Sequence, residues 1–349
     1  MTRLHRSLLA TALGAFALTA TSLAAAPARA QEVTLTLAHF LGPKAPAHAD
    51  FLEPWARRVE EQSDGRISIE IFPAMAMGGK PPELYRQLRD GAADMVWTVT
   101  GYTPGVFPRS EVFELPGVHR GSAEATNMAI QDMEGMLAED FKDIHPILVH
   151  VHAGNALHLV NGCVEKPEDL AGMKLRTPTR TGTWMIESWK AEPVGMPVPD
   201  LPQALSKGAV DGALIPFEVV VPLKVQELTK CSVTAADDGR FGTAVFLFGM
   251  NKERYQGLPD DLKAVIDANS GKAIAADIGK LWDGIEAPGR KLQEETGSPV
   301  KALDADASAA LAKQMEPVVA RWVEEANGAG LDGQALVDAA RGAIEKNSK

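Results

Sequence analysis

Cysteine is scarce in this sequence: its 349 residues include only two, Cys163 and Cys231. Their spacing matches no metal-binding or redox motif, so neither chemistry is expected from them. Each lies near a predicted strand of the middle region, and an oxidising compartment would allow them to form a disulfide. Two separate buried thiols are the alternative, and the sequence leaves both open.

Long apolar runs are also scarce, with one exception at the N-terminus. Two arginines precede an uncharged run over residues 8–23, and Ala28 and Ala30 occupy the two positions that a signal peptidase reads. The run is short, rich in threonine and contains a glycine, which favours a cleavable signal over a membrane anchor. We therefore expect a signal peptide over residues 1–30, cleaved after Ala30, and a mature protein in the periplasm.

Basic residues are outnumbered, with 35 Lys and Arg against 46 Asp and Glu. Removing the first 30 residues takes away three arginines and no acidic residue, which leaves a net charge of −14. Such a surface disfavours nucleic acid and anionic membranes as partners. It does not exclude a small anionic ligand, because one arginine can dominate a buried site.

Familiar catalytic motifs are absent as well. The sequence has no G-x-S-x-G, no phosphate-binding loop and no credible Ser/His/Asp set. His150, His152 and His158 share one side of an extended chain, and His-x-His can chelate zinc. Gly154 interrupts that pattern, and no acidic or cysteine partner stands at ligand spacing. We expect no enzyme chemistry, no metal and no cofactor.

What the sequence does contain is a regular order of strand and helix patterns. Strand-like segments alternate with helical ones in the order β-α-β-α-β, over residues 32–40, 46–62, 65–72, 83–91 and 93–99. Gly91 closes the second helical segment as a C-cap. This order predicts an α/β fold with a mostly parallel sheet covered by helices.

One short pattern occurs twice. "LRDGAADMVW" (88–97) parallels "LSKGAVDGAL" (205–214), each being a helix end, a glycine and a strand entry. This predicts two α/β lobes of similar plan. Two long strand-like passages, 145–162 and 231–251, would connect the lobes as a hinge. From Pro259 the chain reads as almost wholly helical, and these helices are expected to brace both lobes.

Arg176 raises the question of a ligand. The strand in "GMKLRTP" should end in apolar side chains, yet it ends in an arginine, which is costly to bury without an anion. Either a carboxylate of this chain, such as Glu168 or Asp169, pairs with Arg176, or a ligand carboxylate does.

A ligand held between two lobes would lie outside the carboxyl ends of the strands. The residues expected there combine one cation with aromatic and few other charged side chains: Arg176, Phe40, Trp97, Thr98, Tyr102, Asn155, Thr179, Ile215, Phe217 and Glu218. For Trp97 and Phe217 the alternative is core packing. Thr98 and Tyr102 could instead touch no ligand. Thr179 could be an ordinary N-cap. Glu218 could pair with Arg180 or Lys224.

Several motifs resemble one family. "EDLAGMKLRTP" (168–178), "PVGMPVPDLPQALSKGAVDG" (193–212) and the segment 42–79 are similar to the solute-binding proteins of tripartite ATP-independent periplasmic (TRAP) transporters, the C4-dicarboxylate-binding type. The resemblance implies a periplasmic-binding-protein-like fold, with two lobes around a hinged cleft and long C-terminal helices bracing both. It implies capture of an organic acid and delivery to the membrane permease subunits. It also implies that Arg176 forms the main salt bridge to the ligand.

With this fold we expect lobe I at 31–153 plus 242–281 and lobe II at 154–241 plus 282–349. The chain departs from sialic-acid-binding members of the family. A second arginine is replaced by Ala156, an asparagine by Ile215 and a glutamate by Val99. A sugar acid would leave its hydroxyl groups unpaired in such a site. We therefore favour a monocarboxylate with an apolar or aromatic body.

Two other functions remain open at this stage. A secreted hydrolase or lyase on a two-lobed fold would need a base near Arg176, such as Glu218 or His152. A ligand-presenting sensor protein would share the fold and the site. The oligomeric state, monomer or dimer, is also open, since the apolar face of 311–326 would allow a dimer without requiring one.

Overall fold

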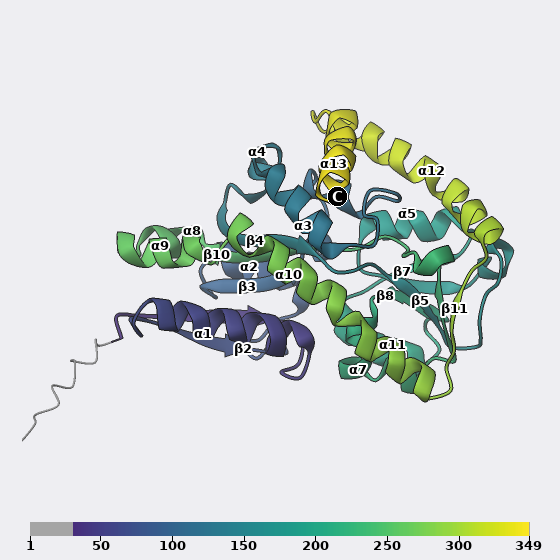
Figure 1. The fold of residues 1–349 in the computed structure, drawn as a ribbon, viewed down its shortest axis with the longest axis horizontal. Helices are drawn as coiled ribbons and strands as arrows, with labels where there is room; N and C mark the ends of the chain where they lie inside the picture. The colour runs from purple at the N-terminus through teal and green to yellow at the C-terminus, as the bar shows by residue number, and fades with distance from the viewer. Residues whose placement is uncertain (1–30, 349) are drawn as a thin grey trace, which may run out of the picture.

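The computed structural model describes residues 31–348, so the predicted signal peptide lies outside the described residues. Two mixed sheets, each flanked by helices, form the two lobes (Figure 1). The predicted two-lobed α/β fold is thus confirmed. No helix within residues 31–348 is both long and apolar enough to cross a bilayer.

The first sheet has the strand order β2-β1-β3-β10-β4. Its three N-terminal strands are parallel, as predicted, while β10 runs antiparallel to both β3 and β4. The bounds are β1 Val33–His39, β2 Ile67–Phe72, β3 Met95–Val99, β4 Ile144–Val151 and β10 Val245–Asn251. All five side chains of β3 are buried, as expected of a strand covered on both faces.

The second sheet has the strand order β11-β9-β5-β8-β6-β7. Its parallel half, β8-β6-β7, repeats the plan of the first sheet, and β5 runs antiparallel to both β8 and β9. The bounds are β5 Ala156–Leu159, β6 Lys174–Thr177, β7 Glu192–Gly195, β8 Gly212–Ile215, β9 Cys231–Thr234 and β11 Val300–Ala302. β11 is a three-residue exception within the stretch predicted to be almost wholly helical, which otherwise forms α9 to α13. Three residues are too few to show a strand period in a sequence.

The repeated pattern has the same structural role in both lobes. In each copy a short helix ends, a glycine takes a positive φ (Gly91 +75°, Gly208 +65°), and a strand begins. The aspartate of each copy then ties its strand to the neighbouring parallel strand. Asp94 accepts the Thr36 N–H at 2.8 Å, and Asp211 accepts the Lys174 N–H, also at 2.8 Å. The two sheets are therefore assembled by one local device used twice.

The helices cover both sheets and connect them (Figure 1). Their bounds are α1 Glu53–Gln62, α2 Leu84–Arg89, α3 Ala123–Asp132, α4 Glu134–Leu137, α5 Arg180–Ser188, α6 Leu201–Ser206, α7 Val220–Leu223, α8 Lys252–Gln256, α9 Asp260–Ala268, α10 Lys272–Gly284, α11 Glu286–Glu295, α12 Ala305–Gly328 and α13 Gly333–Asn347. A π-helical turn, η1 (Ala47–Leu52), precedes α1. Two short 3-10 turns, η4 (Ser110–Glu114) and η8 (Phe217–Val219), recur below because they bear on the site.

Two helical features span the lobes. α10 packs on α3 beside the first sheet, and α11 follows it almost in line and packs on η8 and α7 beside the second (Figure 1). The long helix α12 lies on α5, and α13 then returns to pack on α3 and η4. The C-terminal helices therefore contact both lobes, as predicted. The apolar face predicted for 311–326 is buried at Leu311, Val318 and Trp322.

The two long strand-like passages each divide into two strands. The first becomes β4 and β5 and the second β9 and β10, so each passage leaves one sheet and enters the other. Where they cross, the two passages are hydrogen-bonded to each other, because Asn155 and the Phe241–Gly242 backbone exchange two hydrogen bonds of 2.9 Å.

Of the two alternatives for the cysteines, the structure has the bridged one: Cys163 and Cys231 form a disulfide with a Cα–Cα distance of 5.2 Å.

Candidate functional site

A cavity lies between the two lobes, where strand ends of both sheets meet. The space free of protein atoms here is about 380 Å³, and it includes the part that is open to solvent. The first lobe contributes aromatic side chains from β1, β3 and β10, and the second contributes the ends of β6 and β8. The lining residues are Phe40, Leu41, Trp97, Val99, Tyr102, His152, Asn155, Arg176, Pro178, Val198, Ile215, Pro216, Glu218, Val219, Ala244 and Phe246.

Arg176 is the cation of this cavity, and only 2% of its surface is exposed. Its Nε and Nη2 donate to the Met196 carbonyl at 3.0 and 2.8 Å, and Nη1 donates to the Leu214 carbonyl at 3.4 Å. The guanidinium also interacts with the Tyr102 hydroxyl. Burial lowers the pKa of Arg176, but an arginine keeps its charge in a protein.

None of these partners of Arg176 is an anion. Among the ion pairs within 4.0 Å in residues 31–348, none includes Arg176. Asp169, one predicted internal partner, instead accepts the backbone N–H groups of Glu165 and Lys166. Asp200 acts on the guanidinium only from beyond ion-pair distance. A buried cation held by carbonyl oxygens and without an ion pair is what a carboxylate-binding site requires.

An aromatic wall faces the guanidinium. Phe40 stacks on Trp97 with ring centroids 5.0 Å apart and meets Tyr102 edge-on at 5.4 Å. Phe246 stacks on the opposite side of Trp97 at 4.8 Å. These offset contacts fix the rings, each worth about 0.5–1.5 kcal/mol beyond the area buried. The wall is therefore rigid, flat and apolar.

The polar ends of these rings are satisfied inside the protein. The Trp97 indole N–H donates to His150 Nε2 at 2.9 Å, and the Tyr102 hydroxyl accepts the Val198 N–H at 2.9 Å. Burial lowers the pKa of His150 to about 3, so the ring is neutral and can accept. A ligand would meet the ring faces without disturbing this network.

His152 also lines the cavity, with both ring nitrogens near backbone N–H groups. Gly154 N–H points at Nδ1 at 2.9 Å and Ala244 N–H at Nε2 at 3.2 Å. Burial, aided by His119 and His150, lowers the pKa of His152 well below its usual value. A neutral imidazole has one acceptor nitrogen, and backbone N–H groups already compete for it, so His152 is poorly placed as a base.

Within residues 31–348 no three His, Cys, Asp or Glu side chains are grouped to hold a metal ion.

Glu218 is a buried carboxyl group in the cavity wall, with 4% of the residue exposed. Neither predicted alternative partner reaches it, because Arg180 pairs with Glu111 and Glu325, and Lys224 pairs with Glu227. Burial, aided by the nearby charge of Glu286, raises the pKa of Glu218 well above its usual value.

Of the ten predicted site residues, seven line the cavity: Phe40, Trp97, Tyr102, Asn155, Arg176, Ile215 and Glu218. The other three do not, and for each an alternative stated above holds. Thr98 lies between Trp97 and Val99 on β3, so strand alternation turns it to the opposite face. Thr179 caps α5 by accepting the Gly182 N–H at 3.0 Å. Phe217 is fully buried beneath Arg240 and Arg290.

Several lining residues were not predicted as site residues. Phe246 is paired in register with Val99 across β10 and β3, which brings it to the cavity face. Phe246 could be recognised in the sequence as a bulky apolar residue of the second crossing passage. Its pairing with β3, which places it in the cavity, could not be predicted from the sequence. Val198 and Val219 are short apolar residues in turns after strands, and nothing in their pattern distinguishes them from core.

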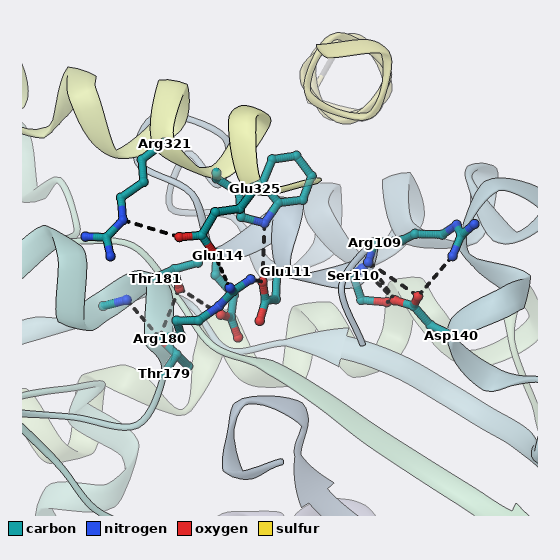
Figure 2. Close-up of polar contacts among 12 residues, drawn as sticks. Arg109, Ser110, Glu111, Glu114, Asp140, Thr179, Arg180, Thr181, Arg321 and Glu325 are labelled. Atoms are coloured by element: carbon teal, nitrogen blue, oxygen red, sulfur yellow. Dashed lines mark hydrogen bonds and ion pairs between the residues drawn. The ribbon is translucent and has the colours of Figure 1, made fainter. Parts of the chain in front are cut away.

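A polar cluster joins the lobes beside the cavity (Figure 2). Arg180, at the start of α5 in the second lobe, binds Glu111 on η4 and also Glu325 on α12, the latter at 2.5 Å. Next to it, the Thr181 hydroxyl donates to Glu114 at 2.9 Å, and the other oxygen of Glu114 accepts the Val245 N–H at 3.0 Å. Burial, followed by the charge of Glu111, raises the pKa of Glu114 to about 8. We call Glu111, Glu114, Arg180, Thr181 and Glu325 the interlobe cluster.

With this geometry established, comparison with known proteins identifies the family. The model of the bacterial extracellular solute-binding proteins, family 7, matches residues 37–326. The chain belongs to this family. It is a TRAP solute-binding protein, as the motifs around Arg176 predicted.

Solved structures of family members resemble the chain throughout. A TRAP solute-binding protein of an unidentified marine microbe is 44% identical, with a TM-score of 0.89, over 91% of this chain and 100% of that one. It is described as specific for aromatic acids, and its structures hold 3-hydroxybenzoate or metahydroxyphenylacetate. A TRAP protein of Rhodoferax ferrireducens, 39% identical with a TM-score of 0.88 over 90% and 98% of the two chains, holds copurified benzoate.

A curated relative, the outer membrane transporter protein TsaT of Comamonas testosteroni, is 24% identical over 92% of this chain and 95% of its own. The family match and these structures confirm the predicted TRAP class. The narrower C4-dicarboxylate designation is loose, because the two solved relatives hold aromatic acids.

Proposed function

We propose that this TRAP solute-binding protein captures an aromatic monocarboxylate, whose carboxylate forms a bidentate salt bridge with Arg176. One observation carries the proposal: Arg176 is buried in an aromatic cavity and has no anionic partner among the described residues. Burying an unpaired guanidinium costs several kcal/mol, and a ligand carboxylate recovers that cost through two parallel hydrogen bonds.

The walls of the cavity support an aromatic body for the ligand. Trp97, Phe40 and Phe246 offer flat ring faces, and Val99, Val198 and Ile215 add aliphatic surface. A benzene ring gains about 25 cal/mol for each Å² of apolar surface that it buries there. The hydroxyl groups of a sugar acid would meet few partners on these walls. The two solved relatives at 39% and 44% identity, which hold aromatic acids, agree with this choice.

Capture requires the lobes to open and close. We place the hinge at the two crossings, with boundaries at 153/154 and 241/242, and we place a third boundary at 281/282, in the last turn of α10. Gly154 and Gly242 stand at the crossings with φ of +110° and +68°, a region that glycine adopts without strain. Closing the lobes excludes water around Arg176 and so strengthens the ion pair.

The remaining steps follow from the family. We propose export by a signal peptide over residues 1–30, cleaved after Ala30, and function in the periplasm as a monomer or dimer. The closed form would deliver its acid to the TRAP permease subunits in the membrane. A ligand-presenting sensor would use the same site.

We also propose that the protein is not an enzyme. Family 7 members are solute-binding proteins. In addition, the ring nitrogens of His152 are engaged with backbone N–H groups, so a hydrolase would lack one of its two predicted bases. Incubation with benzoate followed by mass spectrometry should return the acid unchanged, whereas a product would favour the hydrolase or lyase alternative.

Substitution of Arg176 tests the proposed site. Arg176→Ala should weaken benzoate binding by about 2–5 kcal/mol, because the ligand carboxylate would be buried without its partner. Isothermal titration calorimetry measures the change. Lys174→Ala is the matched control, because Lys174 is an exposed residue of the same strand. Equal affinity for the Arg176→Ala variant and the control would refute the site, provided that circular dichroism shows both folded.

A further inference from the structure

The carboxyl group of Glu218 has no role in the salt bridge, yet it occupies the cavity wall. Its side chain makes no hydrogen bond or ion pair with any residue of the part of the chain that the structure describes. Buried polar groups are almost always paired, so an unpaired one at a ligand cavity calls for a partner from outside the protein.

The backbone under Glu218 is held firmly in place. Glu286, on α11, accepts the N–H of Phe217 at 3.1 Å and that of Glu218 at 2.9 Å. One turn further along α11, Gly289 approaches the Phe217 carbonyl so closely that any side chain there would clash. The position of the Glu218 side chain is therefore set by a rigid turn clamped to a helix.

Two buried carboxyl groups stand near each other here, and their partners decide which one holds a proton. Glu286 accepts two backbone N–H groups and lies 3.7 Å from Arg240, so it is the better stabilised as an anion. Glu218 has no donor, and burial raises its pKa well above the usual value. A neutral carboxylic acid both donates and accepts a hydrogen bond. It also avoids repelling the carboxylate of a ligand in the same cavity.

Apart from Arg176, Tyr102 and Asn155, the cavity wall offers a ligand few polar contacts other than Glu218. Ile215, Val219, Val198 and Val99 are aliphatic, and His152 is engaged with backbone. A hydroxyl group on the ligand ring would both donate to and accept from the Glu218 carboxyl group. An unsubstituted ring would leave that carboxyl group buried without a partner. Sites built in this way discriminate strongly against ligands that lack the hydroxyl group.

We propose that Glu218 is a specificity-determining residue, which hydrogen-bonds a hydroxyl substituent on the ring of the aromatic acid. The inference rests on the proposed function, because it needs the carboxylate on Arg176 to orient the ring. It deepens that function by naming the ligand class as hydroxylated aromatic monocarboxylates.

Calorimetry with benzoate and the three monohydroxybenzoates tests the inference. The wild type should bind at least one hydroxybenzoate tenfold or more tighter than benzoate. Glu218→Leu should reduce that ratio to about one, mainly by losing affinity for the hydroxylated acid. Glu218→Gln, which still donates and accepts, should keep most of the preference. Val219→Ala is the matched control: it trims a neighbouring apolar wall and should change the affinity for all four acids alike.

The outcomes separate this inference from the function on which it rests. If benzoate binds in an Arg176-dependent way but the wild type shows no preference, or Glu218→Leu keeps it, the inference is wrong and the proposed function stands. If none of the four acids binds the wild type, both are wrong. Thermal unfolding of each variant shows whether a lost preference reflects the side chain or a misfolded protein.

Discussion

Buried titratable side chains in this protein divide into two groups by the direction of their pKa shifts. Burial raises the pKa of Glu114 to about 8, and it lowers the pKa of His150 and of His158 to about 3. In each case the neutral form is favoured, because the interior solvates charge poorly. The folded protein therefore resists both the ionisation of these acids and the protonation of these histidines.

The opposite directions of these pKa shifts predict that the free energy of unfolding passes through a maximum as pH changes. Between pH 4.5 and 8 the folded state keeps the proton of Glu114 while the unfolded state loses it, so stability falls as pH rises through this window. Between pH 3 and 6.5 the unfolded state protonates the histidines while the folded state does not, so stability falls as pH drops. The two trends place the greatest stability near neutral or slightly acidic pH.

Glu114→Gln should flatten the alkaline side of this profile. In the wild type, the free energy of unfolding should fall by about 2 kcal/mol between pH 6.5 and 8.5 because of Glu114. Glutamine does not ionise, so this decrease should be lost in the variant. Urea unfolding at the two pH values measures the difference. Glu111 and Arg180, whose charges act on Glu114, are unchanged in the Glu114→Gln variant. The exposed control Glu134→Gln should keep the wild-type slope, and an equal slope in both variants would contradict the prediction.

At the scale of elements, the interlobe cluster joins three segments far apart in the chain. Arg180 on α5 reaches Glu111 on η4, 69 residues away, and Glu325 on α12, 145 residues away (Figure 2). The Glu111 side chain is only 7% exposed, so Arg180 rather than water is its main polar neighbour here. Since η4 packs on the first sheet and α5 follows a strand of the second, the cluster stabilises the arrangement with the lobes together.

Arg180→Ala should therefore favour the open form and weaken ligand binding, although Arg180 touches no ligand in this proposal. We expect a loss of about 1–3 kcal/mol, less than for a fully buried pair because Arg180 is partly exposed. Calorimetry with 3-hydroxybenzoate measures it. Arg321→Ala is the control, because Arg321 binds Glu187 on α5 and Glu325 on its own helix but nothing on η4. Equal affinities for the two variants would show that the cluster does not couple closure to binding.

Much of this architecture could be predicted from local patterns. Strand alternation, glycine caps and the repeated aspartate act between near neighbours, and they predicted β1, β2, β3, β6 and β8, but not β7. Arg176 could be predicted because a charged residue at a strand end violates a simple rule.

Other features depend on residues distant in the chain, which no local pattern reveals. Phe217 was predicted to face ligand, but the approach of α11 buries it, and the hydrogen bonds that fix this turn come from Glu286, 68 and 69 residues later. The failure at Thr98 has a different cause, since strand alternation alone would have turned it away from Trp97. The interlobe cluster was missed because each ion pair looks like an ordinary surface charge in the sequence.

At the scale of the whole molecule, the lobes are connected by two crossings, by the near-continuous line of α10 and α11, and by the α12–α13 pair. The crossings are hydrogen-bonded to each other at Asn155, so they are expected to bend as a unit. The α10–α11 junction at Ile285 is the corresponding break on the helical side, because Pro288 lacks the N–H that an unbroken helix would use. Together these links favour a hinge motion of the lobes over a sliding motion.

Ligand should therefore change the dimensions of the wild-type protein. Small-angle X-ray scattering should show a smaller radius of gyration after 3-hydroxybenzoate is added, because the acid contacts both lobes only when they are closed. The Arg176→Ala variant at the same ligand concentration should show no such decrease. Binding by calorimetry without any change in the wild-type radius of gyration would contradict the hinge.

The clamp of Glu286 and Gly289 on the turn that carries Glu218 has an evolutionary consequence. Because α11 fixes the backbone of this turn, residue 218 can be exchanged without moving the wall around it. A lineage could then change its ligand preference by a single codon change at this position and keep Arg176 and the aromatic wall intact. Among relatives that share this clamp, differences in ligand preference should coincide with substitutions at residue 218, while Gly289 stays invariant.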